Sequence, residues 1–272
     1  MRILNVIFLF GLCLLFMGCS VNKSPLFPSK SKSVAVPYKS DLSKSNLKGK
    51  VKIITSTLFD GIEKDGEVQT GVINSIVITD YNTKGNVSAY HGSVPYEKTS
   101  WNTIFKFNCQ GFVKGSESLN INARYGNTAK KESDKCDSKG NIIKAVRYDE
   151  KGEVTDRSVY QYDSVGNIIE WDNYKANGDL WFVTTYIFDS NSNMVAKYNF
   201  QPDVSFYDKS TFKYDDNSNQ IERKDYVDGK CNYDQSSQYL KFDAAGNWLK
   251  KISFDAEKKP AYVTERLIEY YP

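Results

Sequence analysis

Short runs of alternating apolar and polar residues fill the chain from about residue 47 onward, and turn signals separate them. The run Leu180–Phe188 is rich in aromatic and β-branched residues, and similar runs precede and follow it. Alternation with a period of two is typical of β-strands, and these runs show no helical period. We therefore predict an all-β domain of consecutive antiparallel hairpins.

A six-residue turn signature recurs between these runs, and its clearest copy is Tyr162–Asn167, with the sequence Tyr-Asp-Ser-Val-Gly-Asn. Successive copies begin 26, 29, 26, 26, 26 and 28 residues apart, and a weaker turn lies about 12 residues after most of them. Such a fixed period indicates a repeat architecture. The seven copies are Tyr81–Asn86, Phe107–Phe112, Cys136–Asn141, Tyr162–Asn167, Phe188–Asn193, Tyr214–Asn219 and Phe242–Asn247.

The residues of the signature have defined tasks in a turn. The aspartate can accept hydrogen bonds from backbone amides two or more residues on, and glycine supplies a positive φ. In two copies the glycine is replaced by Ser192 and Ser218. Because asparagine tolerates the left-handed region, we expect Asn191 and Asn217 to take the positive φ there.

Aromatic residues occupy even-numbered positions through the repeats, for example Tyr148, Tyr160, Tyr174, Tyr186 and Tyr198. The period of 26 is even, so we expect these side chains to form a ladder on one face of the sheet. We count about 14 strands from Leu47 to the C-terminus. An antiparallel sheet of this size should twist and curl, and we predict one large, open, curled sheet.

Residues 1–18 have the pattern of a signal peptide, with Arg2 followed by an apolar stretch that is too short to span a membrane. The segment Leu15–Cys19 resembles the lipobox of bacterial lipoproteins, which implies cleavage before Cys19 and acylation of its thiol, as with palmitate. A plain secretory signal is the alternative. Ser20 favours the outer membrane in that family, and both a periplasmic and a surface orientation stay open. The expected location is the bacterial cell envelope.

Residues 19–45 are rich in serine, lysine and proline, and they are predicted to form a flexible basic tether behind the lipidated Cys19. Residues 20–50 contain seven lysines and one aspartate, so the rest of the chain is mildly acidic although the net charge is +3. This distribution argues against nucleic-acid binding and for contact with a membrane through the anchor. We place a degenerate β-repeat region at 46–130 and regular repeats at 131–272.

The motif at Tyr162–Asn167 resembles the YD repeat of the RHS family, and Leu47–Ile53 resembles the start of small YD-repeat bacterial lipoproteins. RHS toxins roll such hairpins into a shell around a toxic segment. The chain lacks the length, the proline-rich core segment and the toxin tail of those proteins. The resemblance therefore implies an architecture and no activity.

Catalytic groups are scarce in this sequence. The single histidine, His91, is expected in a surface loop, and no P-loop, dinucleotide fingerprint or zinc-type spacing occurs. The segments that begin at Asp189 and Asp215 start like calcium-binding loops but lack the required glycine and glutamate, so we interpret them as turns. No catalytic residue, cofactor or metal site is predicted.

Three cysteines follow the anchor, namely Cys109, Cys136 and Cys231. Their odd number and wide spacing do not indicate a disulfide framework, although one bridge stays possible in an oxidising compartment. Cys136 replaces the aromatic residue of its repeat, so we expect a small buried side chain there.

One hairpin carries an apolar cluster on the face opposite the aromatic ladder, and this cluster is the candidate binding patch. If it is exposed, its tryptophans can stack on sugar rings or anchor a protein; the alternative is that the curled sheet covers it. The patch consists of Ile169, Trp171, Trp181, Val183 and Ile187.

Three functions follow from these observations. The leading hypothesis is a lipid-anchored, non-enzymatic module that binds or scaffolds an envelope protein or glycan. The alternatives are an envelope glycan hydrolase that uses Asp or Glu, and a structural protein whose exposed sheet edges pair with further copies.

Overall fold

The computed structural model describes residues 37–108, 111, 113–122, 128–202 and 206–272, and these residues are almost entirely β-structure. The predicted signal peptide, Cys19 and most of the predicted tether lie outside them. One short helix, α1 (Asp41–Lys44), is present, and no helix within these ranges is long and apolar enough to cross a membrane. The strands are β1 (Val51–Lys64), β2 (Glu67–Tyr81), β3 (Val87–Val94), β4 (Thr99–Phe107), β5 (Val113–Asn122), β6 (Thr128–Cys136), β7 (Ile142–Tyr148), β8 (Val154–Tyr162), β9 (Ile168–Lys175), β10 (Leu180–Phe188), β11 (Met194–Phe200), β12 (Phe206–Tyr214), β13 (Gln220–Val227), β14 (Lys230–Phe242), β15 (Trp248–Phe254) and β16 (Pro260–Tyr270).

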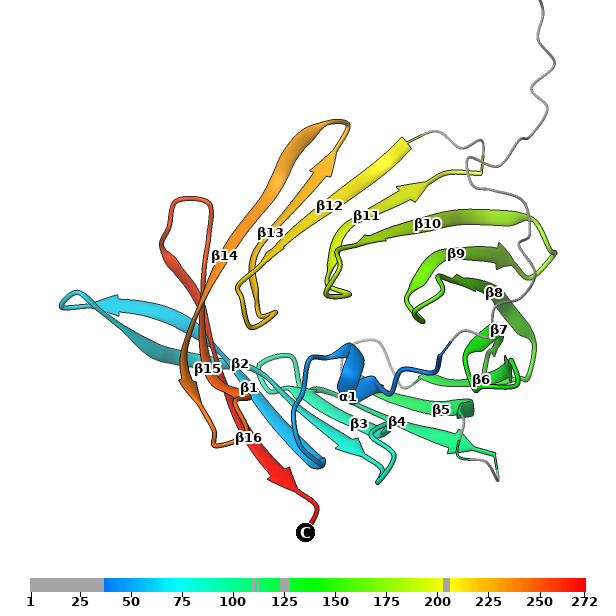
Figure 1. Cartoon of the computed structure of the whole chain (residues 1–272), viewed down its shortest axis with the longest axis horizontal. Helices are drawn as coiled ribbons and strands as arrows, with labels where there is room; N and C mark the ends of the chain where they lie inside the picture. Colours follow the sequence, from blue (N-terminus) through cyan, green and yellow to red (C-terminus); the bar gives the residue numbers. More distant parts are fainter. Residues whose placement is uncertain (1–36, 109–110, 112, 123–127, 203–205) are drawn as a thin grey trace, which may run out of the picture. The chain divides into compact units, whose positions relative to one another are not determined.

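The sixteen strands form a closed antiparallel barrel in which each strand pairs with its neighbours in sequence (Figure 1). The last strand returns to the first, and the pairing runs from Val51 with Tyr270 to Asp60 with Tyr262. The prediction of an all-β antiparallel fold is confirmed, but the predicted open sheet of about 14 strands is wrong. The twist of so many strands brings the two edges of the sheet together, and their backbone groups then pair.

The turn chemistry predicted from the signature is present in the structure. In the turn after β8 the Asp163 N–H donates to the Asn167 carbonyl (2.9 Å), and the Gly166 N–H donates to the Asp163 carbonyl (3.3 Å). Asp163 Oδ1 accepts from the N–H groups of Val165 (2.9 Å) and Asn167 (2.8 Å). One side chain therefore fixes the backbone of the whole turn.

The left-handed residue in the two serine-containing turns is the serine itself. Ser192 has φ 64° and Ser218 has φ 60°, whereas we expected Asn191 and Asn217 in this role. The correction has a geometric cause. The turn demands a positive φ at its fourth position after the aromatic residue, whichever side chain stands there, and serine accepts the strain.

Strand pairing divides the predicted aromatic ladder between the two faces of the barrel. Tyr160 pairs with Trp171, and Trp171 pairs with Thr184, so these three side chains share the inner face. Even-numbered residues therefore point inward on β8 and β10, whereas odd-numbered residues point inward on β9. Tyr160 and Tyr186 consequently lie on the inner face, whereas Tyr174 and Tyr198 lie on the outer face. From β8 to β12, away from the bulges, the numbers of two paired residues add up to an odd number, so the parity of the inward-facing residues changes from each strand to the next. An even repeat therefore preserves this parity only in every second strand.

Residues 37–50, which we call the cap segment, pack across the end of the barrel where the signature turns lie. Leu42 is 9% exposed and packs in one cluster with Val51, Ile54, Tyr81 and Val87. Residues 37–45, which the sequence analysis assigned to the tether, are therefore part of the packed structure. Hydrogen bonds join the cap segment to four turns: Tyr38 Oη to Asn86 Oδ1 (2.5 Å), Lys39 Nζ to Asn167 Oδ1 (2.7 Å), Asn46 Nδ2 to the Asn217 carbonyl (2.8 Å) and the Lys48 N–H to Asn247 Oδ1 (2.8 Å).

Candidate ligand pocket

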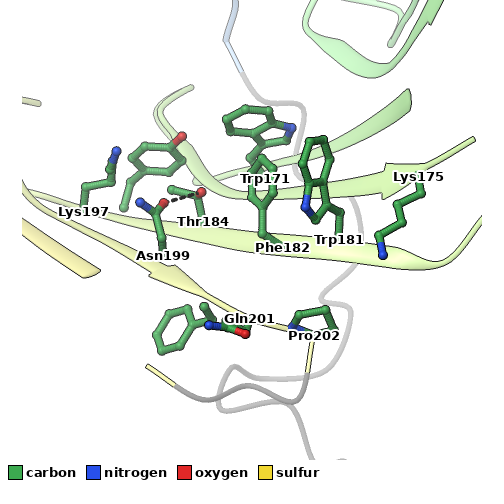
Figure 2. Close-up of a pocket in the computed structure, with 11 residues that line it drawn as sticks. Trp171, Lys175, Trp181, Phe182, Thr184, Lys197, Asn199, Gln201 and Pro202 are labelled. Atoms are coloured by element: carbon green, nitrogen blue, oxygen red, sulfur yellow. Dashed lines mark hydrogen bonds between the residues drawn. The ribbon is translucent and has the colours of Figure 1, made fainter. Parts of the chain in front are cut away.

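A pocket of about 610 Å³ is lined by residues of β9, β10 and β11, most of them at inward-facing positions (Figure 2). Its residues come from neighbouring strands and from the connection after β11. They are Trp171, Lys175, Trp181, Phe182, Thr184, Tyr186, Lys197, Asn199, Phe200, Gln201 and Pro202.

A β-bulge brings Trp181 into this pocket, where Trp171 already lies by the regular pairing of β9. The pairing of β10 with β9 passes from Leu180–Tyr174 directly to Phe182–Asn173, so Trp181 is the extra residue. A bulge re-aims a side chain, and the Trp181 ring here lies beside Phe182. The ring centroids of Trp181 and Phe182 are 5.6 Å apart, at an interplanar angle of 62°. The ring centroids of Trp171 and Phe182 are 5.1 Å apart, at an interplanar angle of 84°. Phe182 thus stands between the two indoles (Figure 2).

The structure separates the other members of the predicted patch. Ile169 lies on the inner face of β9 but does not line the pocket, whereas Val183 and Ile187 lie on the outer face of β10. The prediction that all five share one face is wrong, because residues of equal parity on two paired strands face opposite sides. Only Trp171 and Trp181 are brought together, and Trp181 is 53% exposed.

Polar groups line the pocket beside the aromatic rings. Thr184 Oγ1 donates to Asn199 Oδ1 (2.7 Å), and Asn199 Nδ2 donates to Asp208. The indole N–H of Trp171 is buried without a hydrogen-bond partner among the described residues. The sequence analysis missed Phe182, Thr184 and Asn199. Pairing the two strands across each predicted turn, instead of comparing odd and even positions, would have placed these residues on the same face as Trp171.

A charged cluster continues the inner wall next to the pocket. Arg147 donates to Glu132 (2.6 Å) on one side and to Asp156 (2.5 Å) on the other. Burial, together with the neighbouring Glu132, raises the pKa of Asp134 to about 7. Tyr160 connects the two regions because its ring stacks over Trp171, with centroids 6.2 Å apart.

His91 and the aspartates have structural partners. His91 lies on β3 rather than in a loop, and its Nε2 is 3.0 Å from Asp80 Oδ2. Asp189 and Asp215 each accept backbone amides of their own turn, as the turn interpretation predicts. No group of three or more His, Cys, Asp or Glu within the described ranges is placed to hold a metal ion.

The cysteines provide no bridge within the described part of the chain. Cys136 and Cys231 are both free thiols, and Cys109 lies outside the described residues. Cys136 is half-buried, and its Sγ donates to the Val113 carbonyl (3.1 Å).

Comparison with known proteins identifies the fold and no family. No family model and no curated protein matches the sequence. A porin-like protein from Bacteroides uniformis is similar in structure, with a TM-score of 0.50, 10% sequence identity, and coverage of 80% of this chain and 98% of that one. A porin-like protein from Bacteroides vulgatus has a TM-score of 0.35 at 10% identity and covers 82% of this chain and 98% of that one.

A toxin structure gives a lower score in the same comparison. The Tc holotoxin pore of Photorhabdus luminescens has a TM-score of 0.22 at 12% identity, over 75% of this chain and 15% of that one. The first porin-like neighbour supports a barrel fold. The relation to RHS repeats stays a prediction.

Proposed function

We propose that this chain is a lipid-anchored, non-enzymatic binding module of the bacterial cell envelope, and that it binds a glycan inside the barrel. The observation that carries the proposal is the wall formed by Trp171, Phe182 and Trp181 in a pocket that also holds polar side chains. Pockets of this kind, apolar with a few polar groups, are the usual binding sites of small ligands.

The composition of the pocket favours a sugar chain over other ligands. Aromatic faces offer apolar area to the C–H face of a sugar ring, and hydroxyl and amide groups can bond its hydroxyls. Lys175 and Lys197 line the same pocket, so a cationic ligand would be repelled and an acidic sugar favoured. The location within a barrel suits an extended chain better than the surface of a folded protein.

The outer face of the barrel supports a position in water rather than in lipid. It carries cross-strand ion pairs, such as Lys213 Nζ with Glu222 Oε1 (3.0 Å) and Lys250 Nζ with Glu265 Oε1 (2.9 Å). Barrels that span membranes present an apolar band to the lipid, where charged side chains are destabilising. We therefore infer that the lipidated Cys19 holds a water-surrounded barrel at the membrane.

The two alternative functions have less support. Glu132 lies close enough to Asp134 to raise its pKa, but a glycosidase needs a second carboxylate that is free to act as base or nucleophile. Arg147 further engages Glu132 in an ion pair. A self-associating sheet protein requires free edges, and closure through β1 and β16 leaves none in the described barrel.

The proposal is tested by titrating the full chain in detergent with a panel of acidic and neutral oligosaccharides, including tetragalacturonate and cellotetraose, by calorimetry. We expect saturable binding, stronger for the acidic members. Trp171→Ala and Trp181→Ala should each weaken this binding at least about tenfold, since truncating a central aromatic anchor costs about 2 kcal/mol or more and about 1.4 kcal/mol corresponds to a factor of ten. Trp101→Ala on β4, outside the pocket, is the matched control. A panel without any binder, or equal effects of all three substitutions, would contradict the proposal.

A further inference from the structure

A second cavity, of about 390 Å³, lies between the cap segment and the inner face of the later strands. Asn46 and Leu47 of the cap segment form one side of it, and Tyr239 and Trp248 contribute aromatic rings to the other. The Tyr239 and Trp248 centroids are 5.4 Å apart. The cavity is separate from the pocket of Trp171 and shares no lining residue with it.

Two cationic side chains line this cavity from adjacent strands. Lys251 lies on β15 and pairs with Thr264, which places it beside Arg266 on β16. The guanidinium carbon of Arg266 is 3.4 Å from the centroid of the Trp248 ring, and Lys251 Nζ is 5.5 Å from the same centroid. One indole thus partly compensates two positive charges.

Neither cation has a counter-ion among the described residues. Arg266 and Lys251 form no ion pair there, and Nε of Arg266 is buried without a hydrogen-bond partner. Burial lowers the pKa of Arg266 to about 10, and burial and the charge of Arg266 lower the pKa of Lys251. Asp215 and Asp243, in the turns after β12 and β14, accept the backbone amides of their own turns.

Two buried like charges without an anion are unfavourable, because each has lost its water and each repels the other. Arginine cannot relieve this by losing its proton at neutral pH. An unpartnered guanidinium N–H beside an ammonium group is, in contrast, well suited to bind an anionic oxygen.

We propose that this cavity binds a small organic carboxylate. Its anionic group lies between Arg266 and Lys251, and its apolar body lies against Tyr239 and Trp248. The size of the cavity and its aromatic wall favour a compact apolar body over a bare inorganic ion. Leu47 lines the same cavity, so the bound molecule also contacts the cap segment.

The probe is benzoate, with neutral benzamide as its isosteric control, titrated into the full chain in detergent and in carboxylate-free buffer. We expect saturable binding of benzoate, followed by calorimetry, and at least about tenfold weaker binding of benzamide. Arg266→Met and Lys251→Met should each weaken the binding of benzoate at least about tenfold. Lys250→Met, which removes a charge from the neighbouring outer position, should leave it unchanged.

Thermal unfolding provides an independent readout. Without benzoate, Arg266→Met should unfold at a higher temperature than the wild type, because it removes an unpaired buried charge. Benzoate should raise the unfolding temperature of the wild type and not that of Arg266→Met. If Arg266→Met does not fold, Lys251→Met serves for both readouts. Equal binding of benzoate and benzamide, no binding up to about 10 mM, or equal loss in Lys250→Met would overturn the proposal.

Discussion

Most signature turns depend on one aspartate, whose carboxylate accepts hydrogen bonds from backbone amides of the bend, and Asn82 Oδ1 does the same in the first copy. This role was predictable from residue types, since few side chains other than aspartate and asparagine bond their own backbone two residues on. The position of the strained residue was harder to predict. The geometry of the turn requires a positive φ at one fixed position, whichever residue stands there. Ser192 and Ser218 therefore adopt it, although an asparagine precedes each of them.

Replacing a turn aspartate should destabilise the barrel. Asp163→Ala removes the acceptor for the amides of Val165 and Asn167, and we expect a loss of about 1 to 2 kcal/mol in the free energy of unfolding. Asp179→Ala is the control, because the Asp179 side chain bonds only the side chain of Asn177, and it should cost less than about 0.5 kcal/mol. Denaturant unfolding measures both, and equal losses would contradict this role.

Glycine at a strained serine should stabilise the barrel by different amounts at the two sites. Ser218→Gly relieves a positive φ and should add about 0.5 to 1 kcal/mol to the free energy of unfolding. Ser192→Gly also removes the hydroxyl that accepts from Lys39 Nζ (2.9 Å), so its gain should be smaller. A larger gain at position 192, measured in the same denaturant series, would show that the Lys39 bond contributes nothing.

The raised pKa of Asp134 predicts a pH dependence of stability. A carboxyl group that binds its proton more tightly in the folded state stabilises that state fully below its ordinary pKa of 3.8. That contribution is lost as the pH rises towards about 7. Asp134→Asn should therefore become progressively more stable than the wild type between about pH 4 and about pH 7 in denaturant unfolding, and the difference should level off at higher pH. A difference that does not change with pH would contradict this prediction.

At the scale of the secondary-structure elements, the sequence predicted the strands, their hairpin connections and the positions of the turns. It did not predict which face of the sheet each side chain lies on. A two-residue period reports alternation within a strand but not which residues pair across a turn. The pairing of Tyr160 with Trp171 fixes the face of β9 independently of the repeat length. The bulge at Trp181 then reverses the alternation at one position, which no periodicity reveals.

The packing of the cap segment was not predicted from the sequence, because a segment rich in serine, lysine and proline usually forms a flexible tether. Leu42 is its anchor, and Leu42→Ala should lower the free energy of unfolding by about 2 to 4 kcal/mol. Hydrogen exchange should also show faster exchange of the Lys48 amide, which bonds Asn247. Leu267→Ala, on the outer face and 65% exposed, should cost less than about 0.5 kcal/mol. Equal costs would mean that the cap segment does not pack as described.

At the scale of the whole molecule, closure was not predictable because it depends on the sum of many small twists. The sequence revealed most of the strands, but an open and a closed sheet share the same local pattern. Closure changes the functional argument in two ways. It removes the edges that a self-associating sheet would need, and it encloses the aromatic wall of Trp171 and Trp181.

The outer ion pairs and the lipobox predict how the molecule behaves in cell fractions. The wild type should pellet with membranes and be released only by detergent. Cys19→Ala should appear in the soluble fraction after lysis, because the barrel surface carries ion pairs and the proposed site of acylation is removed. A Cys19→Ala protein that folds but still resists extraction from membranes would contradict a water-surrounded barrel.

The central claim is that the ligand binds inside the barrel, and two adjacent residues on β10 test it most directly. Phe182 faces the pocket between the tryptophans, whereas Val183 faces outward. The measurement is the dissociation constant of the tightest oligosaccharide of the panel for Phe182→Ala and Val183→Ala. We predict at least about tenfold weaker binding for Phe182→Ala and unchanged binding for Val183→Ala. Unchanged binding in Phe182→Ala together with a loss in Val183→Ala would place the site on the outer face and contradict the account.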